Sequence, residues 1–211
     1  MMQIELLPTK ETIQARAVLF DLDGTLVEST GSIGQILKDW AIENALDAQA
    51  VMDYSHGKRS IDIVQHFIGE SDVKAQYDFL TSKFVAASDQ TIAIQGAAEF
   101  IAQLNKLEVP WAVVSSSERI LIEARMLAAG LPKAKSVISA EDVEHGKPSP
   151  EGYLKGAQLL NVDINDCVVF EDAPSGIQAA RQAKAQLITI GGLAKSQCSL
   201  NICDYSQLII K

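Results

Sequence analysis

The sequence lacks the features that mark several classes of protein. Its three cysteines, Cys167, Cys198 and Cys203, are odd in number and match no zinc-binding spacing, so neither a disulfide scaffold nor a zinc module is expected. Positive charge is also scarce, with 18 Lys and Arg against 27 Asp and Glu and a formal net charge of −9. Because binding to a nucleic-acid backbone depends on clustered Lys and Arg, this composition argues against a nucleic-acid partner.

Long hydrophobic runs are absent as well. No stretch approaches the roughly 20 apolar residues that a membrane-spanning helix needs. The start of the chain does not combine a charged segment with a long apolar one, so no signal peptide is predicted. We therefore expect a cytoplasmic protein with reduced cysteines and no membrane partner. No heptad seam or obvious apolar patch indicates an oligomer, and a monomer is expected.

Short apolar runs alternate along the chain with segments of helical spacing. The runs are typical of strands that are buried on both faces of a parallel sheet. They cover residues 17–20, 111–114, 137–139, 168–170 and 187–190, and the helical segments cover 97–107, 118–129, 151–160 and 176–185. This alternation predicts an α/β fold with a Rossmann-like, doubly wound parallel sheet.

One long segment breaks the alternation. Between residues 29 and 91 the only periodic patterns are helical, at 33–45, 60–68 and 73–87. We therefore predict an α/β core made of residues 1–28 and 92–211, with an all-helical domain of residues 29–91 inserted into it.

Acidic pairs follow two of the predicted strands. Asp21 and Asp23 come after the first strand, and Glu171 and Asp172 come after the fourth. In an open α/β sheet the ligand site lies outside the carboxyl ends of the strands, where these side chains would meet. Carboxylates held so close repel one another unless a cation lies between them, and Mg²⁺ favours such oxygen ligands. Gly24 allows the backbone to approach a bound anion closely.

Hydroxyls and a lysine follow the two remaining strand ends of this group. Ser115 and Ser116 lie where a strand gives way to a helix, which is a favourable place for an anion, and Ser117 can cap that helix. Lys147 lies in a turn that Pro148 and Pro150 make rigid, and it can neutralise a phosphoryl oxygen. The four strand ends together predict a site that holds a divalent cation beside a phosphoryl group.

The order of these residues resembles the four signature motifs of the haloacid dehalogenase superfamily. The motifs correspond to Asp21-Leu22-Asp23-Gly24-Thr25, Ser115, Lys147 and Glu171-Asp172. The resemblance implies a magnesium-dependent phosphatase acting on a small phosphorylated metabolite, with the helical insertion as a cap domain that reads the substrate.

The resemblance also implies a role for each motif residue. Asp21 would be the nucleophile that forms an aspartyl-phosphate, and Asp23 would be the general acid and base, with its backbone carbonyl at the metal. Ser115, Ser116, Lys147 and Gly24 would bind the phosphoryl oxygens. Asp172 would complete the magnesium site with Asp21, and Glu171 would lie close to the metal, either as a ligand or beside one.

The segment of the insertion around residue 56 narrows the resemblance. The stretch Ser55-His56-Gly57-Lys58-Arg59-Ser60 is similar to the cap of glycerol-3-phosphate and 2-deoxyglucose-6-phosphate phosphatases, and residues 109–114 and 151–160 are similar to hexose and hexitol phosphate phosphatases. A sugar or polyol phosphate is therefore the expected substrate. His56, Lys58 and Arg59 are the candidates for recognising it, because a basic cluster attracts an anion.

Two alternatives stay open. A β-phosphoglucomutase-like sugar phosphomutase would share the four motifs, but the His that such enzymes carry on the segment leading into the cap is absent from residues 28–35. A non-catalytic binding protein on the same fold is the alternative of another class, and the intact motif residues argue against it.

Overall fold

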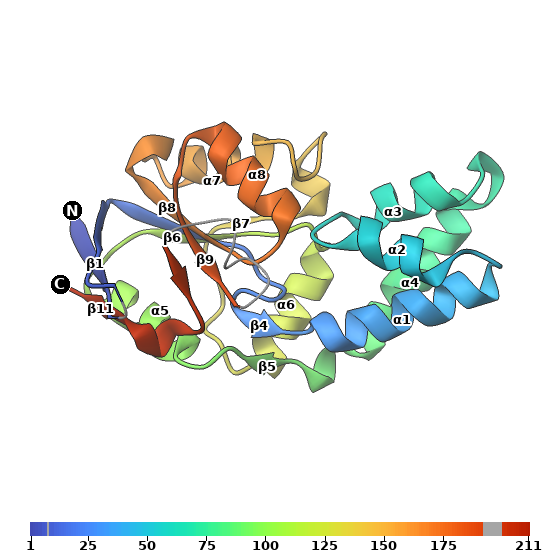
Figure 1. Cartoon of the computed structure of the whole chain (residues 1–211), viewed down its shortest axis with the longest axis horizontal. Coiled ribbons are helices and arrows are strands. Elements are labelled where there is room, and N and C mark those ends of the chain that lie inside the picture. The colour runs from blue at the N-terminus through green and yellow to red at the C-terminus, as the bar shows by residue number, and fades with distance from the viewer. Residues whose placement is uncertain (8, 192–199) are drawn as a thin grey trace.

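A computed structural model describes residues 1–7, 9–191 and 200–211. Its centre is a sheet of six parallel strands in the order β10-β9-β8-β3-β6-β7 (Figure 1). These strands are β3 (Ala17–Phe20), β6 (Trp111–Val114), β7 (Val137–Ile138), β8 (Cys167–Glu171), β9 (Gln186–Ile190) and β10 (Asn201–Ile202). Every residue of β3, β6 and β8 is buried, as their continuous apolar runs predict.

Helices cover both faces of this sheet. Val18 and Phe20 of β3 pack in one hydrophobic cluster with α5 (Ala97–Lys106) and α6 (Arg119–Ala128). Ala17 and Leu19 point the other way, into a cluster with α7 (Glu151–Leu159) and α8 (Pro174–Ala183). The predicted doubly wound α/β fold is therefore confirmed.

A helical insertion separates β3 from β6 in the sequence and lies at one end of the molecule (Figure 1). Its helices are α1 (Thr30–Glu43), α2 (Ala48–Ser55), α3 (Ser60–Phe67) and α4 (Val73–Ala86). They pack around a hydrophobic cluster of their own, with Trp40 at 1 % exposure, and Leu121 of α6 joins that cluster. A helical insertion into the α/β core is confirmed as part of the fold, although the pattern did not reveal α2.

Two short strands carry the chain into and out of the insertion. β4 (Val27–Glu28) leads into α1, and β5 (Ile92–Ala93) follows α4 and a short turn. The two strands pair in an antiparallel ribbon, so the entry and exit of the insertion lie side by side.

A second sheet joins the two ends of the chain, and the sequence analysis did not predict it. Strand β1 (Met2–Leu6) pairs with both β2 (Thr12–Ala15) and β11 (Leu208–Ile210) in antiparallel fashion. Figure 1 shows the N- and C-termini next to each other at the end of the molecule away from the insertion. Ile4 and Leu6 add to the cluster that contains α5, so this sheet extends the main core.

Two of the three cysteines can be located. Cys167 is buried in β8 and Cys203 is exposed, and both are free thiols, while Cys198 lies outside the described residues. None of the helices in the described ranges combines the length and the apolar character that crossing a bilayer requires.

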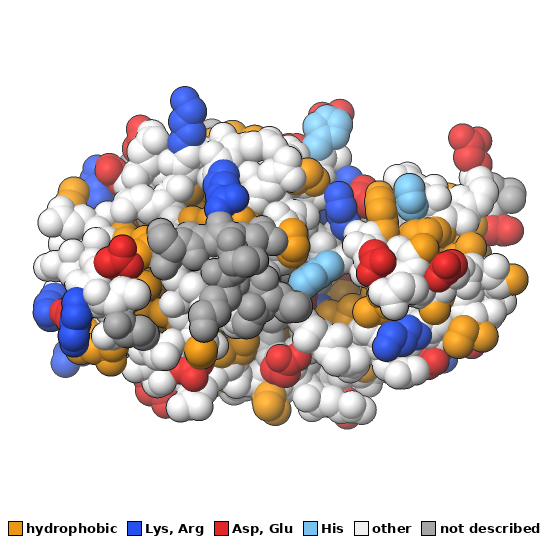
Figure 2. Space-filling model, viewed as in Figure 1, with side chains coloured by type: hydrophobic (Ala, Val, Ile, Leu, Met, Phe, Trp, Pro, Cys, Tyr) orange, Lys and Arg blue, Asp and Glu red, His pale blue; other side chains and the backbone are white. Residues whose placement is uncertain are grey.

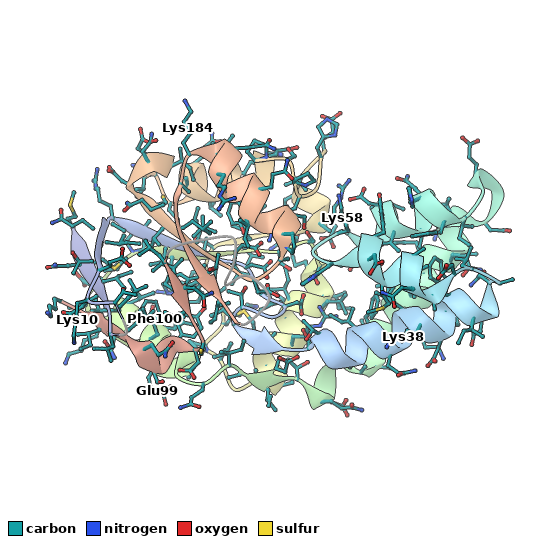
Figure 3. The ribbon with its side chains drawn as sticks, in the orientation of Figure 1. Lys10, Lys38, Lys58, Glu99, Phe100 and Lys184 are labelled. Carbon is teal, nitrogen blue, oxygen red and sulfur yellow. The ribbon has the colours of Figure 1, made fainter. Side chains whose placement is uncertain are left out.

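An aromatic cluster supports the strand ends that carry the acidic pairs. Phe100 of α5, labelled in Figure 3, lies with its ring centroid 6.1 Å from that of Phe20 and 5.5 Å from that of Phe170. Phe20 immediately precedes Asp21, and Phe170 precedes Glu171. The packing of these rings therefore fixes the positions from which the acidic side chains leave the sheet.

Truncation of Phe100 tests this support. We expect Phe100→Ala to lower the free energy of unfolding by about 3–5 kcal/mol, because the ring is 3 % exposed and its loss leaves a cavity. Urea unfolding followed by circular dichroism measures the change. Leu127→Ala is the control, since Leu127 is 81 % exposed and its truncation should change stability by no more than about 0.5 kcal/mol. Equal effects of the two substitutions would contradict the packing argument.

Candidate active site

The strand ends bring the predicted polar residues together at one edge of the sheet. Asp21 follows β3 directly, and its backbone N–H donates to the carbonyl of Phe170 at 3.0 Å. Ser115 follows β6 and is held in the same way by the carbonyl of Ile138 at 3.0 Å. Asp21 and Ser115 are each 7 % exposed, so the floor of the site is nearly closed to bulk water.

Lys147 links the two acidic segments. Its Nζ lies 2.5 Å from Oδ1 of Asp21 and 2.6 Å from Oε1 of Glu171. Burial by itself lowers the pKa of this amine, but the carboxylates of Asp21 and Glu171 outweigh it and raise the pKa above its ordinary value. Lys147 is therefore a fixed positive charge between the first and fourth motifs.

The negative charge that three neighbouring carboxylates can carry exceeds the positive charge of this single ammonium. Asp21, Glu171 and Asp172 each place an oxygen within 4.8 Å of the others. Burial raises the pKa of Asp21 well above its ordinary value, and the neighbouring carboxylates add to the rise while Lys147 opposes it. Burial also raises the pKa of Asp172. Because hard oxygen donors with excess negative charge are what Mg²⁺ prefers, this cluster fits the expected metal.

Glu171 is held more completely than its neighbours. Its Oε1 accepts from the Tyr153 hydroxyl at 2.8 Å as well as from Lys147, and its Oε2 accepts from the Ala173 N–H at 2.9 Å. A Cβ at Gly176 would lie 1.5 Å from Oε1, so only glycine leaves room for this carboxylate. Both oxygens of Glu171 are thus engaged by the protein. By contrast, no hydrogen bond within the described parts of the chain occupies Oδ2 of Asp21.

Asp172 lies against the first motif. Its Oδ1 accepts from the Thr25 hydroxyl at 3.1 Å, and its Oδ2 lies 3.5 Å from Nε2 of His56. Gly24 has a φ of +87°, and a Cβ there would lie 2.2 Å from Oδ2 of Asp172. In this structure, Gly24 therefore makes room for the carboxylate of Asp172.

Asp23 has a separate set of partners. Nη1 of Arg125 lies 2.8 and 2.7 Å from its two oxygens, and hydroxyls donate to it from Ser29 at 2.5 Å and from Ser117 at 2.7 Å. Arg125 is only 2 % exposed. The four hydrogen bonds hold the carboxylate of Asp23 in one orientation beside the floor of the site.

Two of the partners of Asp23, Ser117 and Arg125, differ from what the sequence analysis expected. The expectation that Ser117 caps the helix is wrong, because α6 has Glu118 at its N-cap and the Ser117 hydroxyl is used by Asp23. Arg125 was missed, although a signal exists. It lies four residues after Leu121 and next to Met126, on a face of α6 that is otherwise apolar. A charged residue on such a face needs a partner inside the protein.

The two remaining serines have different surroundings. The Ser115 Oγ accepts from the Ser117 N–H at 3.0 Å, so its own hydrogen is available to a ligand. The Ser116 hydroxyl donates to the carbonyl of Gly57 in the helical insertion at 2.9 Å. Ser116 therefore joins the core to the insertion.

The three basic residues of the insertion that were expected to recognise the substrate do not all lie at the same place. His56 reaches Asp172, and Lys58, labelled in Figure 3, lies with its Nζ 5.5 Å from the centre of the Tyr54 ring. Arg59 is held instead by Asp62, at 2.7 and 2.8 Å, and donates to the carbonyl of Val143 of the core at 3.0 Å. His56 and Lys58 line the cavity described next, whereas Arg59 lies outside its lining.

A cavity of about 290 Å³ separates the core from the insertion. Figure 2 shows a hollow between the two parts of the molecule. Asp21, Asp23 and Ser115 lie on the core side of the cavity, and side chains of α1 to α4 face them. A molecule in this cavity would contact both the acidic cluster and the insertion.

Glu118 is a buried acid beside this cavity, and its charge should affect the stability of the protein. Glu118 is 3 % exposed, its Oε1 has no hydrogen-bond partner among the described residues, and burial raises its pKa. The folded protein then holds a proton that the unfolded chain releases, so stability falls as the pH rises above the ordinary pKa of 4.5. We expect Glu118→Gln to raise the free energy of unfolding at neutral pH and to lose this advantage below that value.

Urea unfolding across the pH range measures this effect. Glu99→Gln is the matched control, because Glu99 is exposed (Figure 3) and its replacement should give no such gain. A gain that does not vary with pH would mean that the charge of Glu118 is not its cause.

Comparisons with known proteins show the family to which the chain belongs. The sequence pattern of haloacid dehalogenase-like hydrolases matches residues 15–184. Hexitol phosphatase A of Escherichia coli (strain K12) is 36 % identical over 185 residues, which cover 86 % of each chain. Glycerol-1-phosphate phosphohydrolase 2 of Saccharomyces cerevisiae is 33 % identical over 189 residues, covering 85 % of this chain and 76 % of the yeast protein.

Solved structures give the same result for the fold. A haloacid dehalogenase family hydrolase from Deinococcus radiodurans R1, with bound phosphate and sodium, superposes with a TM-score of 0.68 at 30 % identity, covering 92 % of this chain and 93 % of that one. A hydrolase from Pseudomonas syringae superposes with a TM-score of 0.81 at 22 % identity, covering 90 % and 94 %. The predicted resemblance is confirmed, and the chain belongs to the family of haloacid dehalogenase-like hydrolases.

Proposed function

We propose that the protein is a magnesium-dependent phosphatase that hydrolyses a small phosphorylated metabolite, a sugar or polyol phosphate, in the cytoplasm. The observation that carries this proposal is the buried Asp21 carboxylate, which contacts Lys147 and lies within 4.8 Å of Asp172 on the core side of the cavity. The names of the sequence relatives support the substrate class. All the groups of the site come from one chain, so we propose that a monomer is sufficient.

In this proposal, Asp21 and Asp172 would hold the metal together with the backbone carbonyl of Asp23. Glu171 acts beside them as a positioning residue, because Lys147, Tyr153 and the Ala173 N–H already engage its oxygens. When bound, Mg²⁺ supplies positive charge that offsets the repulsion between the carboxylates and the phosphoryl group.

The first step is transfer of the phosphoryl group to Asp21. A free oxygen of Asp21 attacks phosphorus, and the bond from phosphorus to the ester oxygen of the substrate breaks. Asp23 gives a proton to that oxygen, which leaves as an alcohol. Lys147, the Ser115 hydroxyl and the backbone N–H of Ser116 bind the phosphoryl oxygens as charge moves between them. Gly24 was expected to join them, but its N–H donates to the carbonyl of Val27, so its part is to leave room for the carboxylate of Asp172.

The second step is hydrolysis of the aspartyl-phosphate. Asp23, now a carboxylate, takes a proton from a water molecule, whose oxygen attacks phosphorus. The bond between phosphorus and Asp21 breaks, and inorganic phosphate leaves. Arg125, Ser29 and Ser117 hold Asp23 in place through both steps.

We propose that residues 29–91 act as a cap domain. Apolar side chains of its helices and the residues His56 and Lys58 face Asp21 across the cavity, so this domain contacts the leaving group and excludes water from the first step. Arg59 would instead join the cap to the core through Val143 and act on the substrate only indirectly.

A phosphomutase remains the alternative within the enzyme class. Such an enzyme must return the phosphoryl group to a bound intermediate before water intervenes. The segment leading into the cap offers the carboxylate of Glu28 but no histidine, and that carboxylate accepts from the Thr30 hydroxyl at 2.6 Å. We therefore favour hydrolysis over mutase chemistry.

Replacement of the nucleophile gives the first test. We expect the wild type to release phosphate from a panel of hexose, hexitol and glycerol phosphates only when Mg²⁺ is present. Asp21→Asn should abolish this release, because the amide cannot form the acyl-phosphate. Asp53→Asn is the control at an exposed aspartate of α2 and should retain full activity. If folded wild type with Mg²⁺ releases no phosphate from any member, the proposed function is wrong.

Arg125 gives the second test. We expect Arg125→Lys to lower kcat/KM for an alkyl phosphate on the order of 10²-fold, because Asp23 loses its fixed orientation as general acid. The loss should be much smaller for 4-nitrophenyl phosphate, whose leaving group departs without a proton. Stopped-time assays of phosphate and nitrophenol release give both values. Equal losses for the two substrates would mean that Arg125 supports the structure rather than Asp23.

A further inference from the structure

The two sides of the cavity differ in polarity. The core side carries the acidic cluster and the serines of the second motif. The opposite side is formed by apolar side chains from five helices: Ile33 and Leu37 of α1, Met52 of α2, Ile63 of α3, Phe84 of α4 and Leu121 of α6. We call these six residues the apolar wall. Four of them, Leu37, Ile63, Phe84 and Leu121, also belong to the hydrophobic cluster of the insertion, so that cluster opens directly into the cavity.

The hydroxyls among the cap residues that line the cavity have no hydrogen left to donate to a ligand, although their oxygens can still accept one. Their hydrogens are already donated within the protein: Thr30 to Oε1 of Glu28 at 2.6 Å, Ser55 to the carbonyl of Val51 at 2.6 Å, and Ser60 to Oε2 of Glu118 at 3.4 Å. The donors that remain on the cap side are His56 and Lys58. His56 lies at the acidic cluster, where it contacts Asp172, and Lys58 follows it two residues later in the sequence.

Gly34 of α1 affects the shape of the apolar wall. Gly34 lies in the interior of α1, where glycine is less favourable than alanine. A Cβ at this position would lie 3.2 Å from the terminal methyl of Met52, so the missing side chain leaves room for that methyl in the wall. Met52 is an adaptable apolar side chain that is half-buried at the cavity surface.

From this arrangement we propose that the substrate is a phosphomonoester whose leaving group is apolar in the part that lies beyond the ester oxygen and its nearest carbons. This inference rests on the proposed phosphatase function and narrows its substrate class to sugar or polyol phosphates that are deoxygenated at the far end, or to other alkyl phosphates. A hydroxyl placed against the apolar wall would lose its hydrogen bonds to water and gain none, whereas a hydrocarbon there gains from burial.

Two substrates of the same ring size and with the same primary phosphate test the proposal. Glucose 6-phosphate carries hydroxyls around its ring, and cyclohexylmethyl phosphate carries none. With the wild type and Mg²⁺, we expect kcat/KM for phosphate release to be higher for cyclohexylmethyl phosphate by about tenfold or more, which is the effect of leaving one or two hydroxyls without partners.

Variants of Met52 link this preference to the wall. Met52→Gln places an amide of similar length in the wall and offers partners to a hydroxyl. We expect it to reduce the ratio of the two kcat/KM values on the order of tenfold. Met52→Leu keeps the wall apolar and is expected to keep the preference. Circular dichroism and thermal unfolding show whether each variant is folded.

The outcomes separate this proposal from the proposed function. If the wild type hydrolyses glucose 6-phosphate as well as or better than cyclohexylmethyl phosphate, the inference of an apolar leaving group is wrong. The proposed phosphatase function would still stand. A ratio that Met52→Gln does not change would show that the leaving group does not lie against this wall, which also overturns the inference. Failure of the folded wild type to release phosphate from either substrate and from the wider panel would overturn the phosphatase itself.

Discussion

The site is organised around an excess of negative charge that is held out of water. Three carboxylates lie within 4.8 Å of one another at the ends of β3 and β8, and Lys147 is the buried cation that joins two of them. This crowding is costly without further positive charge, and much of the surrounding structure serves to hold it. Gly24 and Gly176 clear space for carboxylate oxygens, and the aromatic cluster beneath the strand ends keeps the two strands in register.

The parts of the site that could be predicted depend on topology alone. In a parallel sheet, residues that follow successive strands meet at one edge, so the positions of Asp21, Ser115 and Asp172 followed from recognising their strands. Lys147 was found because its turn joins the same edge. The insertion could be recognised because its helical periodicity interrupts a regular alternation of strands and helices.

The parts that could not be predicted depend on how distant segments approach one another. Arg125 meets Asp23 only because α6 packs beside the first motif, and the Tyr153 hydroxyl meets Glu171 only because α7 covers the other face. The polarity of the cavity is of the same kind, since five helices contribute to its wall. The small sheet of β1, β2 and β11 joins the ends of the chain, a pairing that no local pattern reveals.

The ribbon of β4 and β5 joins the two ends of the insertion. Because these strands are hydrogen-bonded to each other, the entry and the exit of the insertion form one strip rather than two separate linkers. The strip is also anchored, because the N–H of Gly24 donates to the carbonyl of Val27 at 2.8 Å. The strip that carries the insertion is therefore joined by hydrogen bonds to the loop between Asp21 and Val27, so the same short segment both begins the insertion and positions the nucleophile.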